Sequence, residues 1–261
     1  MKKTALVTGA SSGIGYELAI ILAQNSYNLI LVARSKEKLE ALKNTLTKKY
    51  NVDINIITKD LSKLASADEL FEEIKNKQID VLINNAGIGD HGCFSDCDID
   101  KLNQMITLNI TTLTNLTRLI LPSMIEKSSG KIMNVSSIAG FQPGPLMTVY
   151  YATKAYVLSL SVALSIELEN TNITVTAFCP GPTATGFAKT ANLDNSKLFK
   201  NLPVSDVRKV SLYGYKKMQK GKAIAIPGFL NKFTVFLTRL TPRKLNAIIV
   251  KKVQSFRTVE K

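Results

Sequence analysis

Short apolar runs alternate with longer stretches of helical periodicity along the first 180 residues. The apolar runs have the length and the Val and Ile content of buried strands. They are Ala5–Val7, Asn28–Ala33, Ile54–Thr58, Val81–Ile83, Lys131–Val135 and Ile173–Phe178. The helical stretches are Gly15–Gln24, Lys36–Lys49, Leu64–Asn76, Ile99–Met124 and Val149–Asn170. Strands that alternate with helices predict a doubly wound α/β fold, in which helices cover both faces of a parallel sheet.

The pattern changes after Pro180. Residues 181–222 are polar, and we expect them to form a lid over a binding site; Ala223–Ile226 then predicts a short last strand. Beyond Gly228 apolar residues recur twice at helical spacing, which predicts a helical extension over residues 229–261. They are Phe229, Leu230, Phe233, Phe236 and Leu237, then Leu245, Ile248, Ile249, Val253 and Phe256. These amphipathic helices either dock on the main domain, residues 1–228, or lie on a membrane surface.

The positive charge of the chain is concentrated at its end. The net charge is +14, and residues 197–261 hold 16 Lys and Arg against Asp206 and Glu260. The preceding residues hold 18 of each sign. This asymmetry favours an acidic partner, such as an anionic substrate carrier or a membrane surface, and solvated lysines are the alternative. Nucleic acid is not an expected partner, because the tail contains no recognisable nucleic-acid-binding module.

Composition also bears on metals and on the cellular compartment. The chain has three Cys and one His, with no CxxC pair, so neither a structural metal nor a disulfide framework is expected. His91, Cys93 and Cys97 are neighbours, but Gly92 indicates a flexible surface loop. The apolar run after the first lysines is too short for a secretory signal, and no run of about 18 apolar residues predicts a membrane span. We expect a cytoplasmic protein, with peripheral contact to a membrane as the open alternative.

A glycine-rich turn lies between the first strand and the first helix. Glycines let backbone amides approach a pyrophosphate, and a helix N-terminus offers N–H groups and partial positive charge. The candidate cofactor contacts here are Gly9, Ser11, Ser12, Gly13, Ile14 and Gly15. A glycine-rich turn alone is weak evidence, because it also serves as a tight connection. Its place in the first βα unit strengthens the prediction of a dinucleotide site.

Arg34 bears on the choice of cofactor. Enzymes that prefer NAD usually carry an acid about 20 residues after the glycine turn, where it binds the ribose hydroxyls. This chain has Ala33-Arg34 there, and a guanidinium suits a 2′-phosphate. The sequence therefore favours NADP(H), unless Arg34 is only a solvated residue at a strand end.

Polar residues follow the next two strands at their carboxyl ends, where open α/β sheets bind ligands. Asp60-Leu61 follows the third strand, and Asn84-Asn85-Ala86-Gly87 follows the fourth. We expect Asp60, Leu61, Asn85, Ala86 and Gly87 to line the adenine and ribose. Turn formation alone would also favour these residue types.

Taken together, five motifs resemble the short-chain dehydrogenase/reductase superfamily. They are Thr8–Gly15, Asn84–Gly87, Asn134–Ser137, Tyr150–Lys154 and Pro180-Gly181, in the order and spacing of that family. The resemblance covers roughly residues 4–186, and the Gly-x3-Gly-x-Gly turn is similar to the short single-domain branch. It implies a Rossmann-type sheet in three α/β/α layers and hydride transfer between nicotinamide and a carbonyl or alcohol.

The resemblance also implies roles for single residues. Tyr150 corresponds to the acid/base, Lys154 to its activator, Ser137 to the hydroxyl that polarises the carbonyl, and Asn109 to the residue that holds a relay water. Tyr150 and Lys154 are four residues apart on one helix face. A cation within about 4 to 6 Å lowers the pKa of an acid by about 1 to 3 units, so we expect a lowered pKa for Tyr150.

Three details qualify these roles. Tyr151 is also within helical reach of Lys154, and only the resemblance, through the family's 13-residue interval from Ser137, favours Tyr150. Asn109 is a mediocre helix former, so a helix distortion is expected there, with a solvent-facing Asn as the alternative. The loop after the sixth strand resembles the nicotinamide-side loop of the family, and its implied contacts are Pro180, Gly181, Thr183 and Thr185.

The sequence thus predicts an NADPH-dependent carbonyl reductase that acts on a lipophilic or 3-oxoacyl-type ketone. A catalytically idle NADP(H)-binding regulator or scaffold, acting through the basic tail, is the alternative. Ser137, Tyr150 and Lys154 argue against it, because a pure binder does not need them. The resemblance further implies a homodimer or homotetramer paired through Ile99–Met124 and Val149–Asn170.

Overall fold

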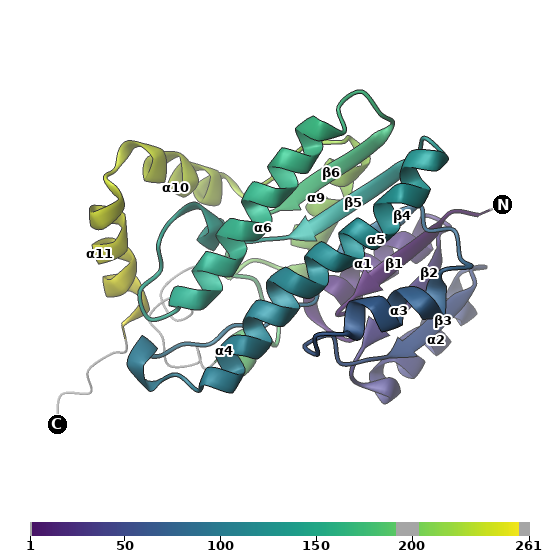
Figure 1. The fold of residues 1–261 in the computed structure, drawn as a ribbon, viewed down its shortest axis with the longest axis horizontal. Coiled ribbons are helices and arrows are strands. Elements are labelled where there is room, and N and C mark those ends of the chain that lie inside the picture. The colour runs from purple at the N-terminus through teal and green to yellow at the C-terminus, as the bar shows by residue number, and fades with distance from the viewer. Residues whose placement is uncertain (1, 192–203, 256–261) are drawn as a thin grey trace.

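A parallel sheet of seven strands forms the centre of the computed structural model, which describes residues 2–191 and 204–255 (Figure 1). The strands lie in the order β3-β2-β1-β4-β5-β6-β7. Their bounds are Thr4–Thr8 (β1), Asn28–Ala33 (β2), Ile54–Thr58 (β3), Val81–Asn84 (β4), Gly130–Val135 (β5), Ile173–Phe178 (β6) and Ile224–Ala225 (β7). The order reverses direction beside β1, so the carboxyl ends of β1 and β4 flank a crevice. The Rossmann-type, doubly wound class is confirmed.

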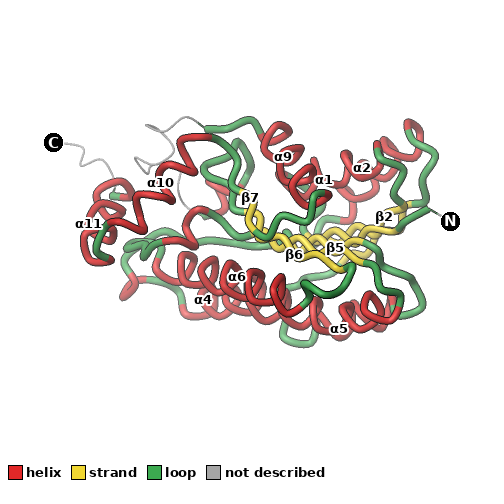
Figure 2. The backbone as a smooth tube through the Cα atoms, turned by 90° about the horizontal axis from the view of Figure 1, so that it is seen from above, coloured by secondary structure: helices red, strands yellow, loops and turns green. Residues whose placement is uncertain are grey.

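Helices cover both faces of this sheet (Figure 2). One face carries α1, α2 and α9, and the other carries α3, α4, α5 and α6. Their bounds are Gly13–Gln24 (α1), Lys36–Lys49 (α2), Ser66–Ile74 (α3), Ile99–Ile106 (α4), Leu113–Glu126 (α5), Thr148–Glu167 (α6) and Val207–Gln219 (α9). Each face has its own apolar core, because the strands are buried on both sides and their side chains alternate between the two layers.

The predicted helix over Ile99–Met124 is three segments in the structure. A π-helical segment, Thr107–Thr112, separates α4 from α5. Asn109 lies in the middle of it, so the predicted distortion at this residue is confirmed. π-Helical insertions widen one turn and redirect the side chains that follow, and they occur often at functional sites.

The predicted lid over residues 181–222 is not one unit. Its last part is α9, which packs beside α1 in the apolar core and buries Val210 and Met218. At Gly214 a Cβ atom would lie 2.9 Å from the ring of Phe178, so this glycine lets the helix approach β6 closely. Several lysines on the exposed side of α9 obscured this buried face in the sequence. Residues 192–203 of the predicted lid lie outside the described residues.

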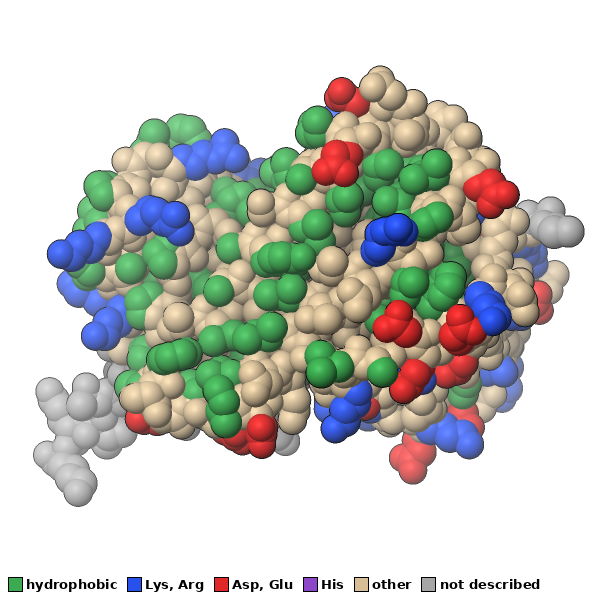
Figure 3. Space-filling model, viewed as in Figure 1, with side chains coloured by type: hydrophobic (Ala, Val, Ile, Leu, Met, Phe, Trp, Pro, Cys, Tyr) green, Lys and Arg blue, Asp and Glu red, His purple; other side chains and the backbone are tan. Residues whose placement is uncertain are grey.

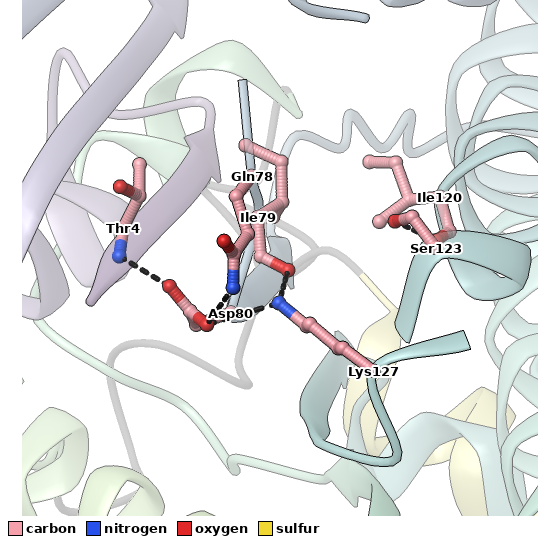
Figure 4. A network of polar contacts seen from close by, with 7 residues as sticks. All are labelled: Thr4, Gln78, Ile79, Asp80, Ile120, Ser123 and Lys127. Carbon is pink, nitrogen blue, oxygen red and sulfur yellow. Dashed lines mark hydrogen bonds and ion pairs between the residues drawn. The ribbon is translucent and has the colours of Figure 1, made fainter. Parts of the chain in front are cut away.

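A polar network fastens the amino ends of the central strands, opposite the crevice (Figure 4). The Asp80 carboxylate accepts hydrogen bonds from the Thr4 amide at 2.7 Å and from Lys127 Nζ at 2.9 Å. Lys127 also donates to the carbonyl of Ile79 at 2.8 Å. Lys127 follows α5, so this network joins β1, β4 and α5 at one end and leaves the other end of the strands open for ligands.

Two helices extend beyond the last strand. They are α10 (Phe229–Leu240) and α11 (Arg243–Gln254), and they lie at one end of the molecule, away from β1 to β3 (Figure 1). Phe256, which the sequence placed in the second amphipathic pattern, lies outside the described residues.

Among the described helices, α6 is long and apolar enough to cross a membrane by length and composition. It packs against β5 and β6 within the domain and carries Tyr150 and Lys154. This packing places α6 against the sheet, although only 28% of its apolar window is buried, so its length and composition alone are weak evidence of a membrane span.

Candidate active site

A cleft of about 1040 Å³ lies across the carboxyl ends of the strands. This volume is at the upper end of the roughly 300 to 1,000 Å³ of ordinary ligand pockets. The cleft brings together nearly all of the residues singled out in the sequence: Gly9, Ser11, Ser12, Gly13, Ile14, Arg34, Asp60, Leu61, Asn85, Ala86, Gly87, Ser137, Tyr150, Lys154, Pro180, Gly181, Thr183 and Thr185. Gly15 and Asn109 do not line it and are buried behind it.

The glycine turn forms one end of the cleft. Gly9 and Gly13 have positive φ angles, 66° and 57°, which favour glycine over residues with a Cβ atom. Asn85 Nδ2 fixes the turn by donating to the carbonyl oxygens of Thr8 and Gly9 at 2.9 and 3.2 Å. The Ser12 side chain does not cap α1, so the first amides of this helix remain available to an anion in the cleft. The turn therefore fits a pyrophosphate.

Arg34 follows β2 and faces the same cleft. The side chain is exposed and, among residues 2–191 and 204–255, has no salt-bridge partner within 4 Å. Desolvation opposes ionisation of the nearby Asp60 carboxyl, yet its pKa is held below the usual value by hydrogen bonds from Ser62 and by the charge of Arg34. Lys38, in the first turn of α2, adds a second cation that the sequence analysis missed. Its spacing of four residues from Arg34 was the available signal.

Ser137, Tyr150 and Lys154 meet further along the same cleft. Ser137 follows β5, where its hydroxyl donates to the Pro180 carbonyl at 3.3 Å and accepts from the Ala139 amide at 3.1 Å. Lys154 is 5% exposed, and its Nζ donates to the Val135 carbonyl at 2.8 Å and lies 5.7 Å from the ring centroid of Tyr150. The Ser136 hydroxyl, buried below, donates to the backbone carbonyl of Lys154 at 2.7 Å and ties α6 to β5.

The ionisation of this group differs from the prediction. Burial raises the pKa of Tyr150, and its hydroxyl contact with Ser137 only partly opposes this shift. Burial lowers the pKa of Lys154 to about 8. The prediction of a lowered Tyr150 pKa counted the nearby cation but not desolvation, which penalises each charged form and is the larger effect here.

The lowered pKa of Lys154 predicts a gain of stability in Lys154→Met. Between pH 8 and the ordinary value of 10.5 the unfolded chain binds the lysine proton and the folded chain does not, so wild type gains stability as pH rises through this window. The variant lacks that burial penalty, which is about 3 kcal/mol for this shift. The variant also loses the hydrogen bond from Lys154 to the Val135 carbonyl, and this loss cancels about 1 kcal/mol of the stability gained.

Urea unfolding of both proteins at pH 7 and pH 10 checks this. We expect Lys154→Met to be more stable by about 1 to 3 kcal/mol at pH 7 and to lose most of that margin at pH 10. The other titrating groups are shared, so the change in the margin isolates Lys154. A margin that is constant with pH would show that the lysine carries no burial penalty.

Asn109 holds the backbone behind the cleft. Its Oδ1 accepts from the Ile88 amide at 3.0 Å, and its Nδ2 donates to the Ile88 carbonyl at 2.9 Å and to Thr153 Oγ1 at 3.1 Å. A Cβ atom at Gly87 would lie 3.1 Å from Asn109 Oδ1 and 3.4 Å from Lys154 Nζ. The absence of a side chain at Gly87 therefore brings the amide of Asn109 and the ammonium of Lys154 to one place, as a proton relay would require.

Replacement of Asn109 by Ala is expected to lower the free energy of unfolding by about 1 to 3 kcal/mol, because both polar groups of Ile88 lose a partner. Asn103→Ala is the matched control. Asn103 is exposed on α4, so a change within about 0.5 kcal/mol is expected. Chemical denaturation measures both, and equal effects would contradict the assigned role of Asn109 in holding Ile88.

The two neighbouring tyrosines have different partners. Tyr151 accepts a hydrogen bond at 2.5 Å from Nε2 of Gln254, the last residue of α11, and packs against Gly144. Tyr150 instead contacts Ser137, and its ring lies 5.2 Å from that of Phe187. The geometry therefore separates two residues that helical spacing alone did not.

His91 is buried, although Cys93 and Phe94 in the same loop are exposed, as the prediction of a surface loop implies. His91 is 6% exposed, and its Nε2 lies 2.9 Å from the carbonyl oxygen of Gln254. The end of α11 buries this residue, a contact over 163 positions of sequence that no local pattern could indicate. Among the described residues no group of three or more His, Cys, Asp and Glu side chains is placed to hold a metal ion.

The loop after β6 closes the cleft near the glycine turn. Thr185 lies against Gly13, where a Cβ atom would meet its side chain at 3.1 Å. The Thr183 hydroxyl donates to the Gly181 carbonyl at 2.8 Å, and Thr183 pairs with Ser205 as an isolated bridge. Phe187, which the sequence did not single out, begins the short helix α7 (Phe187–Thr190) after this loop and packs against the ring of Tyr150.

A glycine turn that fits a pyrophosphate shares one cleft with a half-buried tyrosine, Tyr150, and a buried lysine, Lys154. This arrangement suits an α/β oxidoreductase that uses a dinucleotide, which is the class that the fold and the site define. A model of the short chain dehydrogenase family matches residues 3–196. The chain belongs to the short-chain dehydrogenase/reductase family, as the sequence motifs predicted.

Individual relatives agree with this family. The very-long-chain 3-oxoacyl-CoA reductase of Anas platyrhynchos is 38% identical over 190 residues, which make up 71% of this chain and 61% of that protein. This chain thus spans about three fifths of the length of that curated relative. A solved short-chain dehydrogenase from Sphingobium yanoikuyae, in complex with NADPH, superposes with a TM-score of 0.82 at 31% identity, covering 92% of this chain and 97% of that one. The bulky-bulky ketone specific alcohol dehydrogenase from Comamonas testosteroni superposes with a TM-score of 0.78 at 31% identity, covering 91% of this chain and 92% of that one.

Proposed function

We propose that this protein reduces a ketone with NADPH, or oxidises the matching secondary alcohol, with Tyr150 as the proton donor or acceptor. The observation that carries the proposal is the convergence of Ser137, Tyr150 and Lys154 in the same cleft as a glycine turn that fits a pyrophosphate. A protein that only binds the dinucleotide would need the pyrophosphate site but not Ser137, Tyr150 and Lys154.

The residues act in sequence during reduction. Ser137 and Tyr150 both donate hydrogen bonds to the carbonyl oxygen, where negative charge develops. The hydride would come from a nicotinamide dinucleotide held by the residues of the cleft. Tyr150 is protonated well above neutral pH, so it enters the reaction as the acid and gives its proton to that oxygen. Lys154, held on the Val135 carbonyl, stabilises the resulting phenolate. A new proton then reaches the phenolate from solvent through a water between Asn109 Oδ1 and Lys154 Nζ, which lie close together beside Gly87.

The substrate we propose is a lipophilic or 3-oxoacyl-type ketone. The cleft beyond Tyr150 is lined by apolar side chains of the loop after β6 and of the last two helices, among them Phe187, Phe229, Ile249 and Val253. Relatives named as a 3-oxoacyl-CoA reductase and as a bulky-bulky ketone alcohol dehydrogenase support bulky apolar substrates. NADP(H) as the cofactor is supported by Arg34 and Lys38 and by the NADPH complex of the Sphingobium relative.

The remaining expectations stay part of this proposal. Cytoplasmic localisation comes from the cysteine content of the chain, and pairing of subunits through α4, α5 and α6 comes from the family resemblance. Several apolar side chains on these helices are exposed, including Ile106, Ile125 and Ile166, as an interface between subunits would require. Residues 229–255 hold Lys and Arg side chains without any Asp or Glu, which supports an acidic partner for the tail.

A spectrophotometric assay tests the proposal. Consumption of NADPH, followed by its absorbance, should depend on added substrate in a panel of aliphatic ketones, bulky aryl ketones and 3-oxoacyl thioesters. NADPH that binds tightly but is not consumed with any of them would favour the idle regulator instead. Omission of the protein and of the ketone are the controls for slow NADPH decay.

A further inference from the structure

The last two helices present their apolar sides outward. On α10 the exposed apolar residues are Phe229, Leu230, Phe233, Phe236, Leu237 and Leu240, and on α11 they are Leu245, Ile248, Ile249 and Val253. We call these side chains the outer face. Phe229 is 84% and Leu240 is 67% exposed, whereas helices of water-exposed domains turn such stripes toward the core. The sequence left open whether the stripes dock on the domain; in the structure their described residues stay exposed, from 37% at Val253 to 84% at Phe229.

Polar side chains attach these helices to the domain instead. Asn231 lies against Gly181, where a Cβ atom would meet its amide at 2.5 Å. Asn246 Nδ2 donates to the carbonyls of Thr238 and Thr241 at 3.1 and 3.2 Å and so joins α11 to α10. Gln254 binds Tyr151 and lies against His91. Among the described residues of α10 and α11, two valines, Val235 and Val250, are buried beside Asn246 and Gln254, and most of the other apolar side chains point outward.

The positive charge of these helices indicates which kind of partner covers the outer face. Residues 229–255 include Lys232, Arg239, Arg243, Lys244, Lys251 and Lys252 and no acidic residue. Figure 3 shows blue and green side chains over α10 and α11 with no red ones among them. A second copy of the chain would bring the same cations together, which is unfavourable. An anionic bilayer accepts the apolar side chains and attracts the cations.

The outer face is continuous with the cleft. Phe229 and Leu230 on α10, and Ile249 and Val253 on α11, line the cleft and are exposed at the same time. We propose that α10 and α11 lie in the surface of an anionic membrane and that the cleft opens toward the acyl chains, so that the substrate is a ketone dissolved in the bilayer. The substrate part of this inference rests on the proposed reductase function, and the membrane part does not.

Vesicle flotation of the full chain tests the membrane part. We expect binding to phosphatidylcholine vesicles that contain about one third phosphatidylglycerol, and much weaker binding to phosphatidylcholine alone. The double variant Phe233→Gln/Phe236→Gln removes two outer-face rings that do not line the cleft, and should weaken binding at least tenfold. Leu64→Gln is the control, because Leu64 is 74% exposed on another surface.

A second pair of variants tests the charge. Lys251→Gln/Lys252→Gln should weaken binding to the anionic vesicles by roughly fivefold per lysine, with an effect that shrinks in high salt. Lys48→Gln/Lys49→Gln, two exposed lysines in the last turn of α2, is the matched control and should change little. The chain has no Trp, so Phe233→Trp supplies a single reporter whose emission should shift to shorter wavelength on vesicles, unlike Leu64→Trp.

The outcomes separate this inference from the proposed function. Failure to float with anionic vesicles, or flotation that Phe233→Gln/Phe236→Gln leaves unchanged, overturns it even if ketone turnover is observed. An oligomer in solution that this double variant dissociates would assign the outer face to a second copy and also overturn it. If the inference holds, the double variant raises the apparent KM for a ketone embedded in vesicles by tenfold or more and leaves turnover of a water-soluble ketone unchanged.

Discussion

Replacement of Tyr150 by Phe is expected to lower kcat/KM for ketone reduction by about 10² to 10⁴, the usual contribution of a positioned general acid. The change removes one hydroxyl and retains the ring that packs on Phe187. Because the variant loses a hydrogen-bond donor to the carbonyl as well as the proton, it should lose turnover while it still binds NADPH. Stopped-flow NADPH oxidation, with NADPH affinity from fluorescence titration, measures the two quantities separately.

The adjacent tyrosine provides the matched control. Tyr151→Phe removes the same atom one residue later, where the hydroxyl contacts Gln254 and not Ser137. We expect it to destabilise the docking of α11 by about 1 kcal/mol and to retain most of the turnover. Comparable losses in both variants would assign the proton transfer to neither residue and would direct attention to the shared packing of the two rings, whose centroids lie 6.2 Å apart.

Local regularities made much of the fold predictable from the sequence. The strands Asn28–Ala33 and Ile173–Phe178 and the helix Lys36–Lys49 have the bounds that their apolar patterns indicated. Parallel strands buried on both faces leave long apolar runs, and their carboxyl ends are marked by Gly, Asn and Asp residues. The cofactor residues could therefore be placed on one cleft before any tertiary contact was known.

Other parts of the site depend on contacts that local patterns do not encode. The low pKa of Lys154 follows from complete burial, and burial depends on every element that packs around α6. Gln254, at the end of α11, contacts His91, which lies 163 positions earlier in the sequence. In α9, the face that packs against Phe178 through Gly214 was not evident in the sequence, because lysines occupy the other side of the helix. Helical spacing also found the stripes on α10 and α11, but spacing is the same whether an apolar stripe faces inward or outward.

The cofactor preference should reverse when Arg34 is replaced by Asp. In wild type we expect kcat/KM to be higher with NADPH than with NADH, because Arg34 can bind the 2′-phosphate with a charge-assisted hydrogen bond of about 1.5 to 3 kcal/mol. An aspartate at the end of β2 repels this phosphate and can accept hydrogen bonds from the ribose hydroxyls. The ratio of kcat/KM for NADPH to that for NADH should therefore fall by about 10² to 10³.

Two further variants determine whether the effect is local. Lys36→Asp changes the net charge by the same amount as Arg34→Asp. Lys36 does not line the cleft, and its Nζ lies 3.8 Å from Glu40 Oε1, so the ratio should remain close to that of wild type. Lys38→Gln removes the second cation at the cleft and should lower the ratio by less than Arg34→Asp, since a single ammonium lacks the paired geometry of a guanidinium. Steady-state rates with both cofactors at one ionic strength give all four ratios.

If Arg34→Asp lowered both rates equally, it would have damaged the site as a whole. An unchanged ratio would place the 2′-phosphate elsewhere, and in either case the proposed NADPH preference would lose its main structural support.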